Sequence, residues 1–261
     1  MLLDFGAATD VGLLRDENQD RHLADGTLFA VADGLGGHSG GGTAAAIATG
    51  VLGRHGRLES LGQLIALMGS ANTAIFEAAI DNPRLSGMST TLCALASVGT
   101  ASEPDRLAAT NVGDSRLYAL TDGRFSQVTV DHTITENLVR DGLITPAEAA
   151  NHTDRHTLTR AVGFERRVHV DGWELAAVEG TRFLICSDGL TNEVPDPDIA
   201  EILRSVADPG AAARSLVEQA VRPGRGRDNA TVVVVDVTGG APPGPSGPDQ
   251  LLLATSPAVA A

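Results

Sequence analysis

The residues from Leu117 to Phe125 read Leu-Tyr-Ala-Leu-Thr-Asp-Gly-Arg-Phe, which is an Asp-Gly pair between two alternating runs. An Asp-Gly pair in this setting is the strongest short-range signal for a tight β-hairpin. The two strands of a hairpin are antiparallel. We therefore expect at least part of the sheet structure of this chain to be antiparallel.

Other short runs on both sides of this hairpin are rich in β-branched or aliphatic residues, and turn residues bound most of them, which is typical of strands. These runs are Leu28 to Ala32, Thr91 to Val98, Arg106 to Asn111, Arg182 to Cys186 and Thr231 to Val237. Stretches rich in Ala and Leu predict helices. The predicted helices are Thr43 to Leu52, Ser60 to Ile80, Thr135 to Arg140, Pro146 to Ala150 and Ala211 to Val221. Because strands and helices do not alternate regularly, we expect an α+β fold with antiparallel sheets and helices packed outside them.

Length, charge and cysteine content limit the classes of protein. The 261 residues, 43% of them apolar, are enough for one large domain with a sizeable core. A net charge of -14 argues against nucleic-acid binding, which needs clustered Lys and Arg. No apolar run of about 18 residues and no leader pattern is found, so we expect a cytoplasmic protein without a membrane anchor. Cys93 and Cys186 lie inside strand-like runs and are expected to be buried, reduced thiols.

The composition changes at the end of the chain. From Gly239 onward it consists mainly of Gly, Pro, Ala and Ser, and Asp249 is its only charged side chain. Such composition is typical of disorder. We expect a folded domain over residues 1–238 and a disordered tail over residues 239–261, whose apolar piece, Leu251 to Ala254, is too short to anchor anything.

Aspartates recur where the predicted strands end. Asp33-Gly34 follows the run Leu28 to Ala32, and Asp188-Gly189 follows the run Arg182 to Cys186. The whole set is Asp20, Asp33, Asp114, Asp188 and Asp228. Carboxylates are rarely buried without partners, so these acids are expected to converge on bound cations. A zinc site would show His or Cys at characteristic spacing, and Mg²⁺ or Mn²⁺ therefore fits best.

Six motifs stand in a fixed order along the chain. They are Arg15 ahead of Asn18-Gln19-Asp20, Val31-Ala32-Asp33-Gly34-Leu35-Gly36-Gly37-His38, Gly87-Met88-Ser89-Thr90-Thr91, Asn111-Val112-Gly113-Asp114-Ser115-Arg116, Cys186-Ser187-Asp188-Gly189-Leu190 and Asp228-Asn229-Ala230-Thr231. Together they resemble the motif series of the bacterial metal-dependent serine/threonine protein phosphatases of type 2C, over roughly residues 4–237. The resemblance implies a sandwich of two antiparallel β-sheets flanked by helix pairs (α-β-β-α), with a binuclear Mn²⁺ or Mg²⁺ site at one edge.

The resemblance also implies roles for the acids. Asp33 would bridge two metal ions, and the carbonyl group of Gly34 would bind one of them. Asp188 and Asp228 would complete the coordination of the other ion. Asp114 together with Asp188 would bind a third ion more weakly. Two cations about 3.5–4 Å apart lower the pKa of a bridging water, so that hydroxide is present near neutral pH. By the resemblance, that hydroxide would attack phosphorus in line without a phosphoenzyme.

Three further residues receive roles in the same way. Asp20 would hold metal-bound waters, and Arg15 resembles the phosphate-binding arginine, whose planar fork suits two phosphate oxygens. His38 is a candidate proton donor to the leaving serine or threonine oxygen. The alternative for His38 is a loop histidine that orients groups near the metals.

The polar stretch from Asp131 to Arg166 predicts a small helical insertion that resembles the substrate-bordering flap of the family. Its histidines His132, His152 and His156 are interpreted either as substrate contacts or, in the simpler interpretation, as solvated side chains.

Two other phosphatase chemistries do not fit the sequence. A cysteine phosphatase needs an arginine in the loop after its thiolate, and none follows Cys186 within reach. A phospho-aspartate enzyme needs Asp-x-Asp directly after a strand, whereas Asp196-Pro197-Asp198 lies in a stretch that we interpret as a turn.

The expected partners are phosphorylated proteins, among them Ser/Thr kinases and their substrates, and the expected state is a monomer. Two alternatives stay open, namely a phosphatase dedicated to one regulatory partner and a phosphoprotein-binding module that uses metals only for structure.

Overall fold

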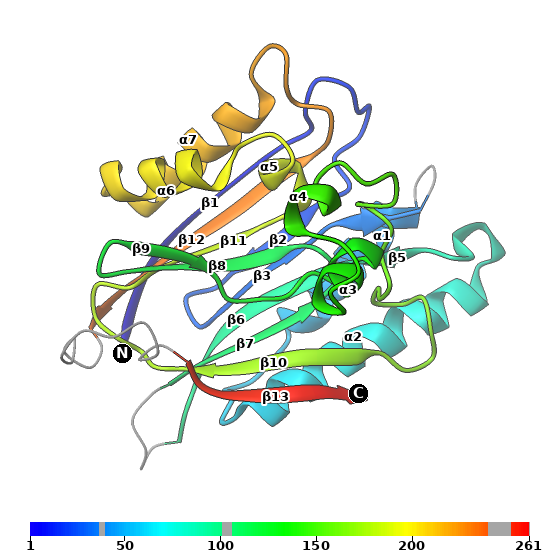
Figure 1. Cartoon of the computed structure of the whole chain (residues 1–261). Coiled ribbons are helices and arrows are strands. Elements are labelled where there is room, and N and C mark those ends of the chain that lie inside the picture. The colour runs from blue at the N-terminus through cyan, green and yellow to red at the C-terminus, as the bar shows by residue number, and fades with distance from the viewer. Residues whose placement is uncertain (37–39, 101–105, 240–251, 261) are drawn as a thin grey trace.

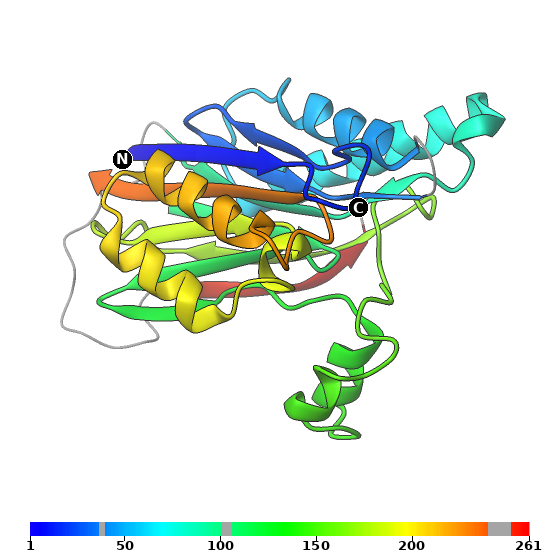
Figure 2. The same ribbon diagram turned by 90° about the horizontal axis from the view of Figure 1, so that it is seen from above.

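Two antiparallel β-sheets lie face to face, and a pair of helices covers the outer face of each (Figures 1 and 2). The computed structural model describes residues 1–36, 40–100, 106–239 and 252–260, the last of these ranges by its backbone. The arrangement confirms the expected α+β sandwich.

The first sheet has the strand order β1-β12-β11-β8-β9, and every neighbouring pair is antiparallel. Its strands are β1 (Leu2–Asp10), β12 (Ala230–Gly239), β11 (Arg182–Cys186), β8 (Arg116–Thr121) and β9 (Arg124–Gln127). The hairpin predicted from the Asp-Gly pair is confirmed, because Asp122 (φ 50°) and Gly123 (φ 75°) both take the left-handed conformation between β8 and β9. Strand β1 was not predicted.

The second sheet has the strand order β13-β10-β7-β6-β3-β2. Its strands are β2 (Arg21–Ala24), β3 (Leu28–Ala32), β6 (Leu92–Val98), β7 (Arg106–Val112), β10 (His169–Leu175) and β13 (Leu252–Ala260). A short ribbon of β4 (Gly34–Leu35) and β5 (Ser89–Thr90) continues from the end of β3.

The prediction of a disordered tail is wrong for residues 252–260, which form β13 and pair with β10. The outer edge of β10 offers unpaired backbone groups that a following segment can use. Composition alone does not show that edge, and the Gly- and Pro-rich composition therefore predicts disorder where residues 252–260 pair with β10. Residues 240–251 lie outside the described part of the chain.

Strand β3 shows why the central strands read as continuous apolar runs. Leu28, Ala30 and Ala32 pack under the helices α1 (Gly40–Leu52) and α2 (Leu61–Asp81), whereas Phe29 and Val31 pack between the two sheets. All five side chains are fully buried. A strand that is buried on both faces needs apolar residues at every position.

The helix α2 is long and apolar enough, by length and composition alone, to cross a membrane. In this structure it packs as a core helix, because Leu64, Met68 and Ile75 are fully buried against the second sheet and α1. Ser60 caps its first turn by accepting a hydrogen bond from the backbone of Gln63.

The first sheet is covered by α6 (Asp196–Ser205) and α7 (Pro209–Val221). The interpretation of Asp196-Pro197-Asp198 as a turn is wrong, because these residues form the first turn of α6. Acidic residues and proline are favoured in that first turn, by the helix dipole and by the missing N–H respectively.

The predicted insertion is present and carries α3 (Ile134–Arg140) and α4 (Pro146–Ala149), which project from the body of the sandwich (Figure 2). Two single-turn elements complete the described structure, the 3-10 turn η1 (Pro83–Leu85) and α5 (Asp188–Thr191). We call the residues 131–166 the flap.

Candidate metal centre

The strand ends bring the predicted acids to one edge of the sandwich. Asp33 follows β3, Asp114 follows β7, Asp188 follows β11, and Asp228 precedes β12. All four side chains line one open cleft of about 1140 Å³. Asp20, just before β2, is buried with 2% of its surface exposed, and Asp188 and Asp228 influence its ionisation. The structure therefore brings together all five predicted acids.

Close backbone contacts explain why glycine follows aspartate in two places in the site. A Cβ atom on Gly189 would stand 1.8 Å from the carbonyl oxygen of Asn229. A Cβ atom on Gly34 would stand 2.3 Å from the carbonyl carbon of Gly41 in the first turn of α1. Contacts this short exclude any side chain. The glycines let the chain after each aspartate pass directly against a neighbouring segment of the site.

The backbone of Asp33 is held by the two threonines that precede β6. Thr90 Oγ1 donates to the Asp33 carbonyl (2.8 Å), and the Asp33 N–H donates to Thr91 Oγ1 (3.0 Å). The Thr91 N–H also donates to the Asp33 carbonyl (2.9 Å). These bonds fix the position from which the Asp33 side chain enters the cleft.

Burial and mutual repulsion dominate the electrostatics of the acids. Burial, and then the charges of Asp20 and Asp188, raise the pKa of Asp33 well above its usual range. Burial, and then the charges of Asp188 and Asp131, raise the pKa of Asp114 to about 8. Burial and the charge of Asp228 also raise the pKa of Asp188, against an opposing hydrogen bond with Asp33. Cations at this place would relieve the repulsion and favour the ionised carboxylates.

Asp20 provides the clearest test of whether a metal fits. Its Oδ2 accepts a hydrogen bond from Ser187 Oγ (2.8 Å), whereas its Oδ1 is buried without a hydrogen-bond partner among the residues that the structure describes. Burial raises the pKa of Asp20 to about 6, although the bond from Ser187 opposes that rise. A buried carboxylate oxygen without a partner is costly. An ordered water on a nearby ion would supply the missing donor.

Within the described ranges, no three His, Cys, Asp or Glu side chains already close around one point. Asp228 Oδ2 accepts instead from Arg15 Nη2 (2.7 Å), and Asp188 Oδ2 accepts from Asn192 Nδ2 (3.0 Å). The partners Arg15 and Asn192 lie on the wall of the cleft, and their side chains can rotate. The residues present, all hard oxygen donors, therefore fit Mg²⁺ or Mn²⁺ once these two carboxylates exchange Arg15 and Asn192 for a metal ion.

Arg15 lies at the rim of the cleft with 55% of its side chain exposed. Its hydrogen bond to Asp228 and the charges of Asp228, Asp33 and Asp188 raise its pKa. The guanidinium group is therefore within electrostatic range of three of the acids, as a phosphate ligand beside a metal centre requires.

Asn229 stands in the motif that begins at Asp228, but the sequence did not reveal its role. Its Oδ1 accepts from the N–H of Gln19 (2.8 Å), and its Nδ2 donates to the carbonyls of Val11 (2.8 Å) and Glu17 (3.0 Å). It thereby holds the loop that carries Arg15 and Asp20. Its place beside Asp228 was the only signal that could have indicated this role.

His132 also differs from expectation, because it is only 4% exposed and not solvated. Its Nδ1 accepts a hydrogen bond from the N–H of Gly113 (3.1 Å), which directly precedes Asp114. Its Nε2 lies 3.1 Å from Asp171 Oδ2, and Asp171 is also paired with Arg160 Nη1 (2.6 Å). His132 therefore connects the base of the flap to the strand end that carries Asp114.

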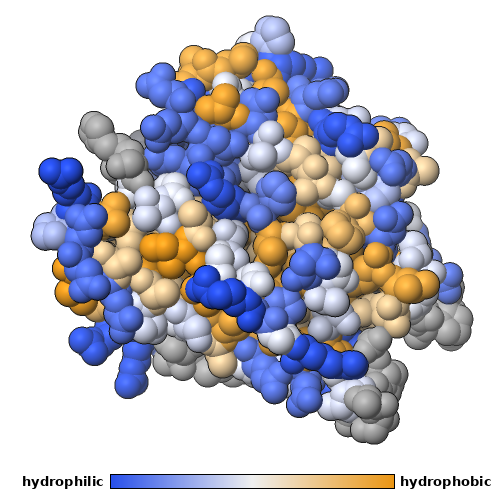
Figure 3. Space-filling view, turned by 180° about the vertical axis from the view of Figure 1, so that it is seen from behind, coloured by the Kyte–Doolittle hydropathy of each residue, from blue (hydrophilic) through white to orange (hydrophobic). Residues whose placement is uncertain are grey.

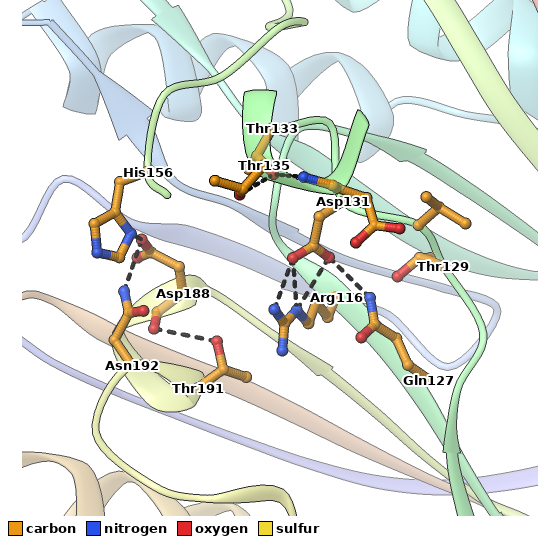
Figure 4. Close-up of polar contacts among 12 residues, drawn as sticks. Arg116, Gln127, Thr129, Asp131, Thr133, Thr135, His156, Asp188, Thr191 and Asn192 are labelled. Carbon is orange, nitrogen blue, oxygen red and sulfur yellow. Dashed lines mark hydrogen bonds and ion pairs between the residues drawn. The ribbon is translucent and has the colours of Figure 1, made fainter. Parts of the chain in front are cut away.

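Arg155, His156 and Leu158 of the flap line part of the cleft, and Figure 4 shows His156 next to Asp188. His156, half exposed, places Nδ1 3.9 Å from Asp188 Oδ2, whereas His152 pairs with Asp154. Arg116 makes a bidentate contact with Asp131 at the start of the flap (2.7 Å to Oδ2) (Figure 4). His38 lies outside the described residues, and its role stays a prediction.

Comparisons with known proteins agree with this geometry. The family model described as protein phosphatase 2C matches residues 13–221. The serine/threonine protein phosphatase PstP of Mycobacterium tuberculosis is 39% identical over 91% of this chain, and the match spans 45% of PstP. The serine/threonine phosphatase stp of Listeria monocytogenes is 33% identical, over 87% of this chain and 93% of stp. A crystal structure of the PstP catalytic domain with two manganese ions superposes with a TM-score of 0.80, 37% identity and coverage of 91% and 99% of the two chains.

Proposed function

Because this chain belongs to the protein phosphatase 2C family, we propose that it hydrolyses phosphoserine and phosphothreonine in proteins in a reaction that requires Mn²⁺ or Mg²⁺. The observation that carries the proposal is the gathering of Asp33, Asp114, Asp188 and Asp228 around one cleft, with Arg15 at its rim. The chain spans about half the length of PstP, so the activity is proposed for the part that this sequence covers.

The metal ions would be held by the residues that the cleft already groups. Asp33 and the Gly34 carbonyl, with Asp188 and Asp228, would hold two ions, and Asp114 would contribute to a third. When bound, such ions supply an activated water and neutralise charge on the phosphate.

The residues of the chain itself bind and orient the substrate. Arg15 can grip two phosphate oxygens with its planar fork, and its present partner Asp228 shows that the fork reaches the carboxylates. Asp20 Oδ1, which is buried without a hydrogen-bond partner among the described residues, would hold a water beside the metal ions. His38 is the proposed proton donor to the leaving alkoxide.

Other phosphatase mechanisms find no support in this structure. The thiols of Cys93 and Cys186 are both free and fully buried, and burial raises the pKa of Cys186 to about 12. A thiol of this kind is not a nucleophile near neutral pH. Asp196 starts a helix on the outer face of the first sheet and accepts a hydrogen bond from Tyr118, so it is not an acceptor of phosphate in the cleft.

We also propose a cytoplasmic monomer that acts on phosphorylated proteins, among them Ser/Thr kinases and their substrates, and not on nucleic acid. The two buried reduced thiols and the net charge of -14 support this proposal. A binding-only module would predict a missing acid or a missing Arg15, and all of these residues are present.

The proposed function is tested by hydrolysis of a phosphothreonine peptide with Mn²⁺, with Mg²⁺ and with a chelator. We expect turnover only with metal, and a loss of at least about 100-fold in the Asp188→Asn variant, because a charge that stabilises the transition state is removed. Circular dichroism of both proteins checks that they are folded. If folded, metal-loaded protein shows no turnover, the proposal is wrong.

A further inference from the structure

A second groove, of about 590 Å³, runs along α1 next to the candidate metal centre. One stripe of α1, spaced by three or four residues, forms its wall: Thr43, Ala46, Ile47, Gly50, Val51 and, just past the helix end, Arg54. Residues at this spacing share one face of a helix. The opposite side of α1, with Ala44, Ala48 and Leu52, is buried in the core. Apolar surface of α1 therefore reaches the outside. Figure 3 shows the face of the molecule on which α1 and α2 lie, with apolar patches among polar side chains.

This α1 groove is continuous with the cleft of the metal centre. Glu17 and Gln19 line both of them. The first turn of α1 also touches the metal centre directly, because Gly41 packs against the backbone of Gly34. An extended chain that leaves the cleft over Gln19 therefore enters the groove at the start of α1.

The charges in the groove select the kind of chain that would bind. Arg21 and Arg54 line it, and neither pairs with a carboxylate of the described residues. Arg21 donates to the carbonyls of Asn18 (2.8 Å) and Asp20 (2.7 Å). Arg54 is exposed beyond the end of α1, with Nη1 4.0 Å from where a Cβ atom on Gly50 would lie. Glu17 lines the end of the groove that meets the cleft, so the groove carries two arginines against one acid. In a chain with 33 acids and 19 bases, this local surplus of positive charge complements an anionic partner.

We propose that the α1 groove binds the stretch of substrate chain that flanks the phosphorylated residue, and that Arg54 pairs with an acidic side chain of that stretch. This proposal rests on the proposed phosphatase function. At about 1.5 Å per residue, α1 separates Arg54 from the metal centre by about 20 Å. An extended peptide covers that distance in about six residues. The acidic residue is therefore expected about six positions from the phosphothreonine.

The test compares phosphothreonine peptides of equal length and composition at low ionic strength. One carries a pair of aspartates about six residues before the phosphothreonine, one carries them about six residues after it, and one carries glutamines at both places. A small aryl phosphate, which reaches only the cleft, is measured beside them. We expect one of the two acidic peptides to show a KM about 3- to 5-fold lower than the neutral peptide, as a surface ion pair allows, with equal kcat.

Two pairs of variants locate the effect. Arg54→Gln is expected to abolish the preference for the acidic peptide, whereas Arg124→Gln, on the exposed strand β9, is expected to leave it unchanged. Gly50→Leu fills the groove and is expected to raise the KM of every long peptide, whereas Gly50→Ala is expected to leave it unchanged. Leu and Ala both favour the helix over Gly, so loss of fold would not explain a difference. Neither substitution touches the aryl phosphate site.

The outcomes separate the two proposals. If the aryl phosphate is hydrolysed and all peptides have the same KM, in wild type and variants alike, the proposal for the α1 groove is wrong. The proposed phosphatase function would still hold. No turnover of any substrate by folded, metal-loaded protein would overturn the proposed function itself. A change of oligomeric state in Gly50→Leu without a change in peptide KM would show that a second copy of the chain occupies the groove, and would also overturn the proposal.

Discussion

At the scale of single residues, the candidate metal centre is a set of carboxylates whose burial lowers the stability of the metal-free protein. Asp114 illustrates this, because burial raises its pKa to about 8 in the folded state, against about 4 in an unfolded chain. Between these two values the folded protein keeps a proton that the unfolded chain has lost. The free energy of unfolding therefore falls as the pH rises through that window.

Asp114→Asn removes this contribution, since the amide does not titrate. In metal-free protein we expect the variant to be more stable than wild type at pH 8, by a few kcal/mol, and the advantage to shrink by up to about 1.4 kcal/mol per pH unit toward pH 4. Urea unfolding at several pH values between pH 4 and pH 8 measures it. Parallel stability curves for the two proteins would contradict the raised pKa.

His132 gives a second prediction at this scale. Its Nδ1 accepts the Gly113 N–H, so His132→Asn, which keeps an acceptor at that place, should preserve the loop better than His132→Ala. The alanine variant leaves a buried N–H and Asp171 short of a partner, for an expected loss of about 2–4 kcal/mol. Urea unfolding compares the two variants. Equal losses would mean that the Gly113 bond contributes little.

The sequence indicated the acids but not the residues that hold them. Asp33 and Asp188 could be predicted because each ends a fully buried run and precedes a glycine. His132 and Asn229 could not be predicted, because their partners Gly113, Asp171 and Gln19 lie far from them along the chain. A polar side chain in a loop is solvated in most cases, and only the tertiary structure shows that these two are buried.

At the scale of elements, the glycines that follow Asp33 and Asp188 set how closely two segments of the chain approach each other. Gly189→Ala would place a Cβ atom 1.8 Å from the Asn229 carbonyl, so we expect a loss of about 3 kcal/mol in stability. Gly56→Ala is the matched control, because no atom of the described residues lies within 4 Å of its Cβ position, and its change should stay within about 0.5 kcal/mol. Urea unfolding of both variants decides, and similar losses would refute the close-contact argument.

The strands differed in how clearly the sequence indicated them. β3 and β11 were predicted with their observed ends, since both are short runs that are buried at every position. β1 and β10 were missed, because Asp4 and Gly6 interrupt the first and Asp171 and Gly172 the second. These strands have partly exposed positions, so polar residues are tolerated there and the apolar run is broken.

The edge strand β13 permits a prediction about truncation. Among the described strands it pairs only with β10, and no predicted site residue lies in it. Removal of residues 240–261 should therefore leave phosphothreonine hydrolysis unchanged and lower stability by less than about 2 kcal/mol. The freed edge of β10 should increase self-association, which light scattering measures. A loss of hydrolysis in the truncated protein would assign the segment a larger role.

At the scale of the whole molecule, the two sheets carry the acids on strand ends from both halves of the chain. Asp20 and Asp33 come with the second sheet, whereas Asp188 and Asp228 come with the first. A metal ion shared by these residues would therefore tie the two layers of the sandwich to each other. Binding to the folded state alone stabilises it by mass action.

We therefore expect Mn²⁺ at about 100 times its dissociation constant to raise the free energy of unfolding by about 2.7 kcal/mol, and the melting temperature by about 5–10 °C. At one fixed Mn²⁺ concentration the gain should be larger at pH 8 than at pH 6, because protons compete with the metal for carboxylates whose pKa is raised. Asp33→Asn should abolish it, whereas Asp81→Asn, at the exposed end of α2, should keep it. Differential scanning calorimetry with Mn²⁺ and with chelator measures all three proteins. An equal gain in Asp33→Asn would place the metal elsewhere, and with it the catalytic centre.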